Sequence, residues 1–416
     1  MEGNKMIRTL LASLFIIISC NLFGQIRDDS WFEEDTLMHI SLNGNVGLVS
    51  DQVPLSFSKL FFQGGFITDT QKESALDKLC QLNRFGAQLR YGVEVKMKPE
   101  YKTEKGEKTQ MFFGYEHQVL LFMSFTDDLF SLIMQGNTFS IGDFMDIGGT
   151  YFSNFDFHKV YAGSMRTFGK NNQYVFGVAP FMSFHKPPLI VDITKGSIET
   201  KADTSSIQAK ISGKMISGLK QEKFVQSIGG GIDLFIGFKE ILNDYYVELS
   251  LKNFGVYGFE GRRVMVDSDG MVNISGVHLN NLNHPDSAMI NYVDSISDEF
   301  GFSNDTLINS VMLPYCVSLE VISLNKKNYS LSGRISYYPG QHMLPFVEIF
   351  PQYRFNKFFQ VGIPVAWGGM GGLFAGAYAG VNLKNLSVKM NVQRCFSFSG
   401  FHATGLSGGV MVGFKF

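Results

Sequence analysis

Residues 245–252 read YYVELSLK, a run in which apolar and polar side chains alternate. Residues 385–393, NLSVKMNVQ, repeat the pattern, with Leu386, Val388, Met390 and Val392 separated by polar residues. A period of two is typical of a β-strand with chemically different faces. One face of each strand is expected to meet lipid and the other a wet lumen.

Other parts of the chain carry similar signals. Strands are predicted at about 37–47, 89–97, 111–124, 155–167, 173–184, 224–238, 312–323, 329–337, 346–355, 358–366, 373–381 and 410–416. With the two segments above, the count is about fourteen, within a range of 12–16. An even number of strands suits closure into an antiparallel transmembrane β-barrel. The predicted fold class is therefore all-β, with short helical inserts.

The composition supports a single barrel domain at residues 26–416. After Gln25 the chain has no apolar run of the length that a transmembrane helix needs. The 44 Gly and 40 Phe suit tight turns and aromatic rings that face an apolar surround. The net charge of −2 provides no basic field, so nucleic acid is not an expected partner.

Residues 1–25 have the features of a signal peptide. Lys5 and Arg8 precede the apolar stretch 9–23, and Gly24 stands before Gln25. An alternative is a lipobox ending at Cys20, which would carry a lipid anchor. The predicted location is the outer membrane, with its lipid as one partner. The terminal alternation that ends in Phe416 resembles the signal read by the barrel-assembly machinery.

Two polar stretches near 186–223 and 269–310 interrupt the strand pattern and are predicted to be extramembrane inserts. Apolar residues between 289 and 300 recur at helical spacing, and short helices are also expected at 70–82 and 127–134. Helices of this kind commonly occlude a lumen. Residues 266–271, VDSDGM, are predicted to form a hairpin turn.

Several of these features together resemble a known group of proteins. They are the leader ending Phe23-Gly24-Gln25, the segment LSLKNFG at 249–255, the Leu313-Pro314 pair and the aromatic C-terminus. The chain resembles uncharacterised outer-membrane β-barrel proteins of Bacteroidota and, more distantly, PorP/SprF-like and PorV-like barrels. The resemblance implies a fold and a location, and it supplies no active site.

The sequence carries no catalytic signature. The eight His are isolated along the chain, and neither HExxH nor GxSxG occurs. The mature cysteines, Cys80, Cys316 and Cys395, are scattered and odd in number. An enzyme, a metal site and a cofactor are therefore not expected.

One group of residues is a candidate for function. The alternation assigns six charged side chains to the lumen, namely Arg90, Glu94, Glu248, Lys252, Arg334 and Lys389. They could line a pathway, or they could pair across the lumen and rigidify it. The first functional hypothesis is a pore or transporter for small or hydrophobic solutes. The alternative is a non-transporting structural or accessory subunit of a secretion or surface-anchoring complex.

Overall fold

The computed structural model describes most of the chain from residue 37 onward. The described ranges are 37–63, 66–98, 109–136, 141–168, 174–200, 207–218, 227–239, 245–267, 272–274, 307–323, 328–356, 358–397 and 404–416. The predictions of a signal peptide, of an anchor at Cys20 and of a helix within 289–300 fall outside these residues.

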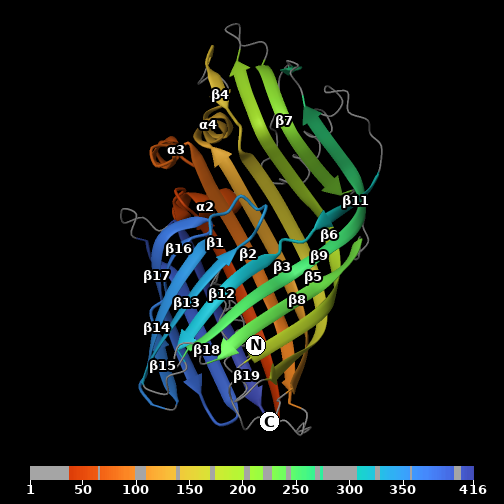
Figure 1. The fold of residues 1–416 in the computed structure, drawn as a ribbon. Coiled ribbons are helices and arrows are strands. Elements are labelled where there is room, and N and C mark those ends of the chain that lie inside the picture. The colour runs from red at the N-terminus through yellow and green to blue at the C-terminus, as the bar shows by residue number, and fades with distance from the viewer. Residues whose placement is uncertain are drawn as a thin grey trace, which may run out of the picture.

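The described strands form a closed antiparallel barrel of fourteen strands (Figure 1). In barrel order they are β1 (Met38–Ser50), β2 (Leu82–Met97), β3 (Thr109–Thr126), β5 (Thr150–Phe168), β6 (Tyr174–Thr200), β8 (Ser227–Lys239), β9 (Tyr245–Asp267), β12 (Cys316–Ser323), β13 (Tyr329–Tyr337), β14 (Phe346–Arg354), β15 with β16 (Phe359–Gly362 and Val365–Gly368), β17 (Gly371–Asn382), β18 (Leu386–Ser397) and β19 (Gly405–Lys415). Each of the fourteen predicted ranges overlaps one of these strands. The predicted fold class is confirmed.

Pairing between the first and last strands closes the barrel. The register of β1 against β19 runs from His39↔Lys415 to Val49↔Gly405. The backbone N–H of Phe416 adds a hydrogen bond of 2.9 Å to the carbonyl of Met38. Because unpaired backbone groups are costly in lipid, closure is what allows a sheet to span a membrane.

Several barrel strands are built from two segments. Between β6 and β9 the wall consists of β8 at one end and β7 (Ile207–Gly218) at the other, and both run in the same direction. Next to β9 lie β11 (Leu307–Met312) and β12, with Pro314 between them, and Pro364 separates β15 from β16. Proline has no N–H to donate to a neighbouring strand, which accounts for the last two interruptions.

One side of the barrel rises well above the other (Figure 1). The predicted insert near 186–223 contributes to this extension, since β6 continues through Pro187-Pro188 to Thr200 and pairs there with β7. The predicted hairpin at 266–271 is wrong. Residues Val272–Ile274 form β10, which pairs antiparallel with β7, as the end of β9 does. β10 therefore runs in the same direction as β9 and does not fold back on it. Pairing with β7 outweighed the local turn signal of Asp and Gly.

The two ends of the barrel differ in the length of their connections. At the end where the C-terminus lies, consecutive strands are joined by 3 to 11 residues. At the opposite end, 31 residues join β1 to β2, and 39 residues separate β9 from β11. We call these the short-turn end and the long-loop end.

Three helices lie at the long-loop end: α2 (Leu55–Gln63), α3 (Asp69–Leu76) and α4 (Asp127–Gln135). Their apolar residues, including Phe57, Ala75 and Phe130, pack against Leu121 and Met123 of β3. The intervening Leu120 and Phe122 belong to a different cluster, which lies inside the barrel. The expectation that the helices near 70–82 and 127–134 occlude the lumen is therefore wrong, because they cover the outer wall. No described helix has the length and apolar character needed to cross a membrane.

The outer surface of the barrel is apolar over its middle and aromatic near its edges. Exposed rings include Phe168 and Tyr174 at the short-turn end and Tyr337 and Trp367 nearer the long-loop end. Aromatic girdles of this kind mark the two membrane interfaces of a barrel.

In β9 the alternation shifts by one residue at Asn253, whose φ of 60° lies in the left-handed region. Lys252 and Asn253 consequently both face the lumen, and both line its central cavity.

We predict that Leu249→Arg weakens the barrel by about 2–4 kcal/mol, because Leu249 is 45% exposed on the outer face at membrane level. Glu260→Arg is the matched control, since Glu260 is an exposed residue of the same strand nearer its long-loop end. Urea unfolding in lipid vesicles, followed by heat-modifiable gel migration, measures both variants. Equal unfolding of the two would contradict the assignment of the lipid-facing surface.

Candidate functional site

The candidate site is the lumen, and its central part is filled with paired charges. The charged lumen network contains six basic residues, Arg90, Lys96, Lys159, Lys252, Arg334 and Lys389, and six acidic residues, Glu94, Glu116, Asp233, Glu248, Glu320 and Glu348. All six residues that the sequence nominated are among them. Most members are largely buried inside the barrel, so their charges need partners.

The nominated residues on β2 pair with neighbouring walls. The Arg90 guanidinium forms an ion pair with Glu116 of β3 at 2.5 Å. Glu94 accepts a hydrogen bond of 2.9 Å from the Tyr161 hydroxyl of β5 and lies 3.3 Å from the Lys96 ammonium. These contacts join three consecutive strands along the inner face.

The other nominated residues lie on β9, β13 and β18. Arg334 pairs with Glu348 at 2.8 Å, and the Gln393 amide donates to the same carboxylate at 3.0 Å. Glu248 accepts a hydrogen bond of 2.7 Å from Tyr246. The Lys389 side chain is buried, with 6% of its surface exposed. The Lys252 ammonium lies 5.8 Å from the Phe235 ring centroid, within range of a cation–π contact.

A second set of contacts in the network was not predicted. The Lys159 ammonium lies 2.7 Å from Asp233 and 2.8 Å from the Asn253 side-chain oxygen. The backbone N–H of Asn253 donates to the other Asp233 oxygen at 2.6 Å. Lys159, Asp233 and Asn253 line the small central cavity. Arg90, Glu116 and Lys252 line it as well. Alternation in the sequence indicates which face a residue belongs to. It does not indicate the register between strands, which decides which residues become partners.

An apolar cluster lies on the long-loop side of the charged network. We call it the upper lumen cluster; it comprises Val49, Leu120, Phe122, Tyr151, Phe155, Phe157, Phe181, Ile190, Ile216, Tyr257, Phe259, Leu313, Met343 and Met370. Along β3, Glu116 and Gln118 border the cavity, and Leu120 and Phe122 follow toward the long-loop end. The lumen therefore changes from polar to aromatic along its axis.

A loop from β13 to β14 crosses the lumen above this cluster. This plug loop, residues 338–345, reaches the β5 wall, where the Gln341 side-chain oxygen accepts hydrogen bonds from Tyr151 at 2.9 Å and Ser153 at 3.0 Å. The His342 ring stacks on Tyr151 with centroids 4.4 Å apart. Met343 inserts into the upper lumen cluster. The plug loop is thus held across the lumen mainly by side-chain contacts.

Further contacts connect the plug loop to other strands. The Arg84 guanidinium of β2 donates to the His342 carbonyl at 3.2 Å, and Arg84 also lies 3.6 Å from the Asp51 carboxylate. The His342 imidazole lies 3.8 Å from Asp192 of β6. Loss of solvent lowers the pKa of His342, which keeps its ring neutral near pH 7. Burial raises the pKa of Asp51 to about 6, in spite of the nearby Arg84.

Groups that could act in catalysis or bind a metal were also located. Ser183 and His185 form a buried hydrogen bond of 2.7 Å in the upper lumen, but no carboxylate of the described residues hydrogen-bonds this imidazole. The expectation that the chain is not an enzyme stays a prediction. Three metal-ligating side chains, His117, Asp156 and His158, lie together on β3 and β5, a grouping that their spacing in the sequence does not indicate.

Comparison with known proteins gives likeness at the level of the barrel. No family model matches the chain, and no curated protein matches it. The toluene transporter TodX of Pseudomonas putida is 6% identical with a TM-score of 0.43, over 96% of this chain and 95% of that one. A Pseudomonas aeruginosa FadL homologue is 8% identical with a TM-score of 0.44, over 92% and 91% of the two chains. The translocator domain of NalP from Neisseria meningitidis is 10% identical with a TM-score of 0.31, over 93% and 91%.

We predict that Lys159→Met destabilises the barrel by about 3–5 kcal/mol, because it leaves the buried Asp233 carboxylate without its cation. Adding Asp233→Asn should recover most of this loss, since the amide oxygen can still accept from the Asn253 N–H. A double-mutant cycle of urea unfolding in vesicles measures the coupling. If the two losses simply add, the ion pair does not stabilise the lumen.

We also predict a pH dependence that originates at Asp51. Its folded pKa of about 6 exceeds the ordinary value of 3.8, so the folded state binds the proton more tightly. The resulting stabilisation is complete below pH ~4 and is lost as the pH rises through 6. Asp51→Asn should flatten the stability profile between pH 4 and 7, as measured by unfolding at each pH. An unchanged profile would show that Asp51 titrates normally.

Proposed function

We propose that the protein is an outer-membrane transporter for small, largely apolar solutes, whose plug loop opens to admit them. The observation that carries this proposal is the upper lumen cluster under the plug loop. The lumen of an outer-membrane barrel is usually polar. An aromatic interior section adjoining the mouth suits an apolar solute better than water or ions.

The way in which the plug loop is held also supports a closure that can open. Its contacts with the β5 wall are two hydrogen bonds to Gln341 and the stack of His342 on Tyr151, with no strand pairing across the lumen. Gly340 and His342 have φ values of 74° and 52°. A loop held mainly by side chains opens at a lower free energy than the strands around it.

For an outer-membrane barrel, the short turns and both termini belong to the periplasmic side and the long loops to the outside. Solute would then enter at the long-loop end, contact the upper lumen cluster and pass the charged lumen network next. Phe416 lies at the periplasmic end, where its exposed ring is available to the barrel-assembly machinery.

A second function is favoured by a different observation. The charged lumen network pairs its members across neighbouring strands and leaves only a small cavity, which suits a lumen built for rigidity. In that case the barrel is a structural or accessory subunit, and the helices α2–α4 on its outer wall offer contact surface, with Phe66 beside them 86% exposed.

A reversible lock on the plug loop separates the two functions. Ser153→Cys with Gln341→Cys joins two side chains that already hydrogen-bond, in a background where Cys80, Cys316 and Cys395 are serine. We expect oxidation to reduce uptake of the apolar fluorophore N-phenylnaphthylamine by expressing cells to the level of cells that lack the protein. Reductant should restore it.

The single variant Ser153→Cys is the control and should show the same uptake in both redox states. Planar-bilayer conductance of the purified protein, with heat-modifiable migration to verify folding, gives a second measurement. A folded barrel that shows neither uptake nor conductance in the reduced state would refute transport and favour the accessory subunit.

A further inference from the structure

A polar cluster interrupts the apolar outer wall of the barrel. The role inferred for it is independent of the proposed transport. His117 on β3 and Asp156 and His158 on β5 belong to the outward-facing half of the alternation, since their neighbours Gln118, Phe157 and Lys159 face the lumen. Ionisable side chains on a lipid-facing surface are costly and, where retained, point to a function.

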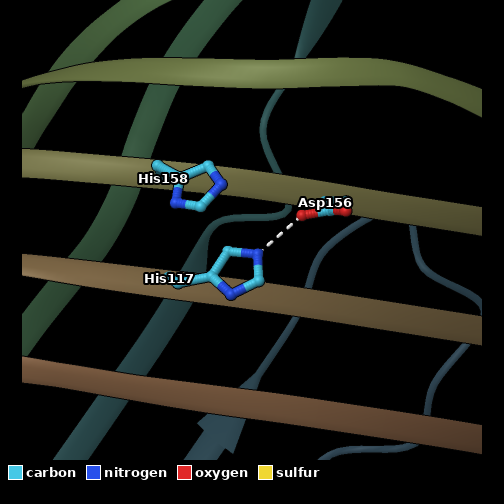
Figure 2. A group of neighbouring side chains, drawn as sticks. All are labelled: His117, Asp156 and His158. Atoms are coloured by element: carbon cyan, nitrogen blue, oxygen red, sulfur yellow. Dashed lines mark hydrogen bonds and ion pairs between the residues drawn. The ribbon is translucent and has the colours of Figure 1, made fainter. Parts of the chain in front are cut away.

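The ligand atoms of the three side chains lie close together. The His117 imidazole lies 2.7 Å from a carboxylate oxygen of Asp156. The two imidazoles are stacked, with centroids 4.2 Å apart and planes 12° from parallel, because His117 and His158 are directly paired in the register. Figure 2 shows a ring nitrogen of each histidine turned toward Asp156. The ligand atoms of all three residues lie within 4.8 Å of one another.

The surrounding residues fit the second shell of a metal site. The Tyr115 hydroxyl contacts Nδ1 of His158 at 2.7 Å. Such a partner fixes the orientation of a metal-binding imidazole. The register of β5 against β6 shifts between Asn154 and Asp156, because β6 carries an extra residue between Lys186 and Leu189, and Lys186 is paired with Asp156.

Lys186 forms an ion pair with the Asp156 carboxylate in this structure. The Lys186 ammonium lies 2.7 Å from the second oxygen of Asp156, and its own side chain is 68% exposed. An exposed lysine can move into solvent, so it competes with a metal for Asp156 without blocking the site. The ion pair explains how Asp156 is tolerated on the outer wall in the absence of a metal.

The cluster lies at the height of the membrane interface that is nearer the long-loop end. His158 lies ten residues along β5 from Phe168, whose ring stacks on Tyr174 in the short-turn girdle. Ten residues of a tilted strand rise ~25 Å along the barrel axis, about the height of the apolar band. Tyr91 beside His117 and Tyr115 beside His158 suit this interface.

We propose that His117, Asp156 and His158 form a binding site for a divalent transition metal of the Zn²⁺ type on the outer wall. Two imidazole nitrogens and one carboxylate oxygen are the ligand set of many zinc sites, and they disfavour Ca²⁺ and Mg²⁺. Three protein ligands leave a fourth position, which faces outward from the wall toward the headgroup layer. The site is formed by neighbouring strands, and on binding the two stacked imidazoles tilt toward each other so that their lone pairs meet at the ion.

Titration calorimetry of the untagged barrel in detergent with ZnCl₂ at pH 7.5 tests the site. We expect one saturable Zn²⁺ per chain, no comparable heat with Ca²⁺ or Mg²⁺, and at least ~10-fold weaker binding in His117→Gln and in His158→Gln. Lys186→Gln should bind Zn²⁺ more tightly, because the competing ammonium is gone. His342→Gln is the matched control, since it alters a histidine–aspartate pair elsewhere.

A second measurement covers the case in which a histidine variant does not fold. Zn²⁺ should protect His117 and His158 of the unaltered barrel from diethyl pyrocarbonate, as read by mass spectrometry, while His342 stays reactive. Absence of saturable Zn²⁺ binding, or equal binding in the folded His117 and His158 variants, would overturn the proposal. So would equal modification of these histidines with and without Zn²⁺.

Discussion

Backbone pairing between β1 and β19 is the constraint on which the rest of the structure depends. In lipid every strand must have a partner on both sides, so the sheet has to close before any part of it is stable there. Closure then separates the side chains into two environments. An outer face of apolar and aromatic residues meets the membrane, while charged residues such as Arg90, Lys159 and Glu348 are enclosed and must neutralise one another inside the barrel.

Much of the fold follows from alternation in the sequence, because a closed sheet leaves each strand little choice of face. All fourteen barrel strands overlap ranges that were predicted from the sequence, six of them from a clear period of two. The long extension of β6 beyond Pro187-Pro188 was missed, since its Lys-, Ser- and Thr-rich residues stand above the membrane, where no alternation is required. The turn expected at 266–271 failed for a related reason: pairing with β7 is a tertiary contact that a local motif cannot report.

The candidate sites were predictable to different degrees. Period two indicated which charged residues face inward, but their partners, such as Asp233 for Lys159, depend on register across several strands. The helices were located along the chain but assigned to the lumen, because the sequence does not say which side of a wall an insert covers. His117 and His158 showed no ligand spacing. Their signal was a polar residue on the apolar side of the alternation, repeated on two strands that proved to be neighbours.

The charged lumen network has a further consequence for ions. With six basic and six acidic side chains interleaved along the wall, this network has no net formal charge. Pores that select by sign use rings of like charge to focus a field along their axis. A neutral, interleaved wall produces no such field, so neither cations nor anions are drawn into the barrel from a distance. If the barrel transports solutes as proposed, discrimination between them comes from their shape and polarity at close contact.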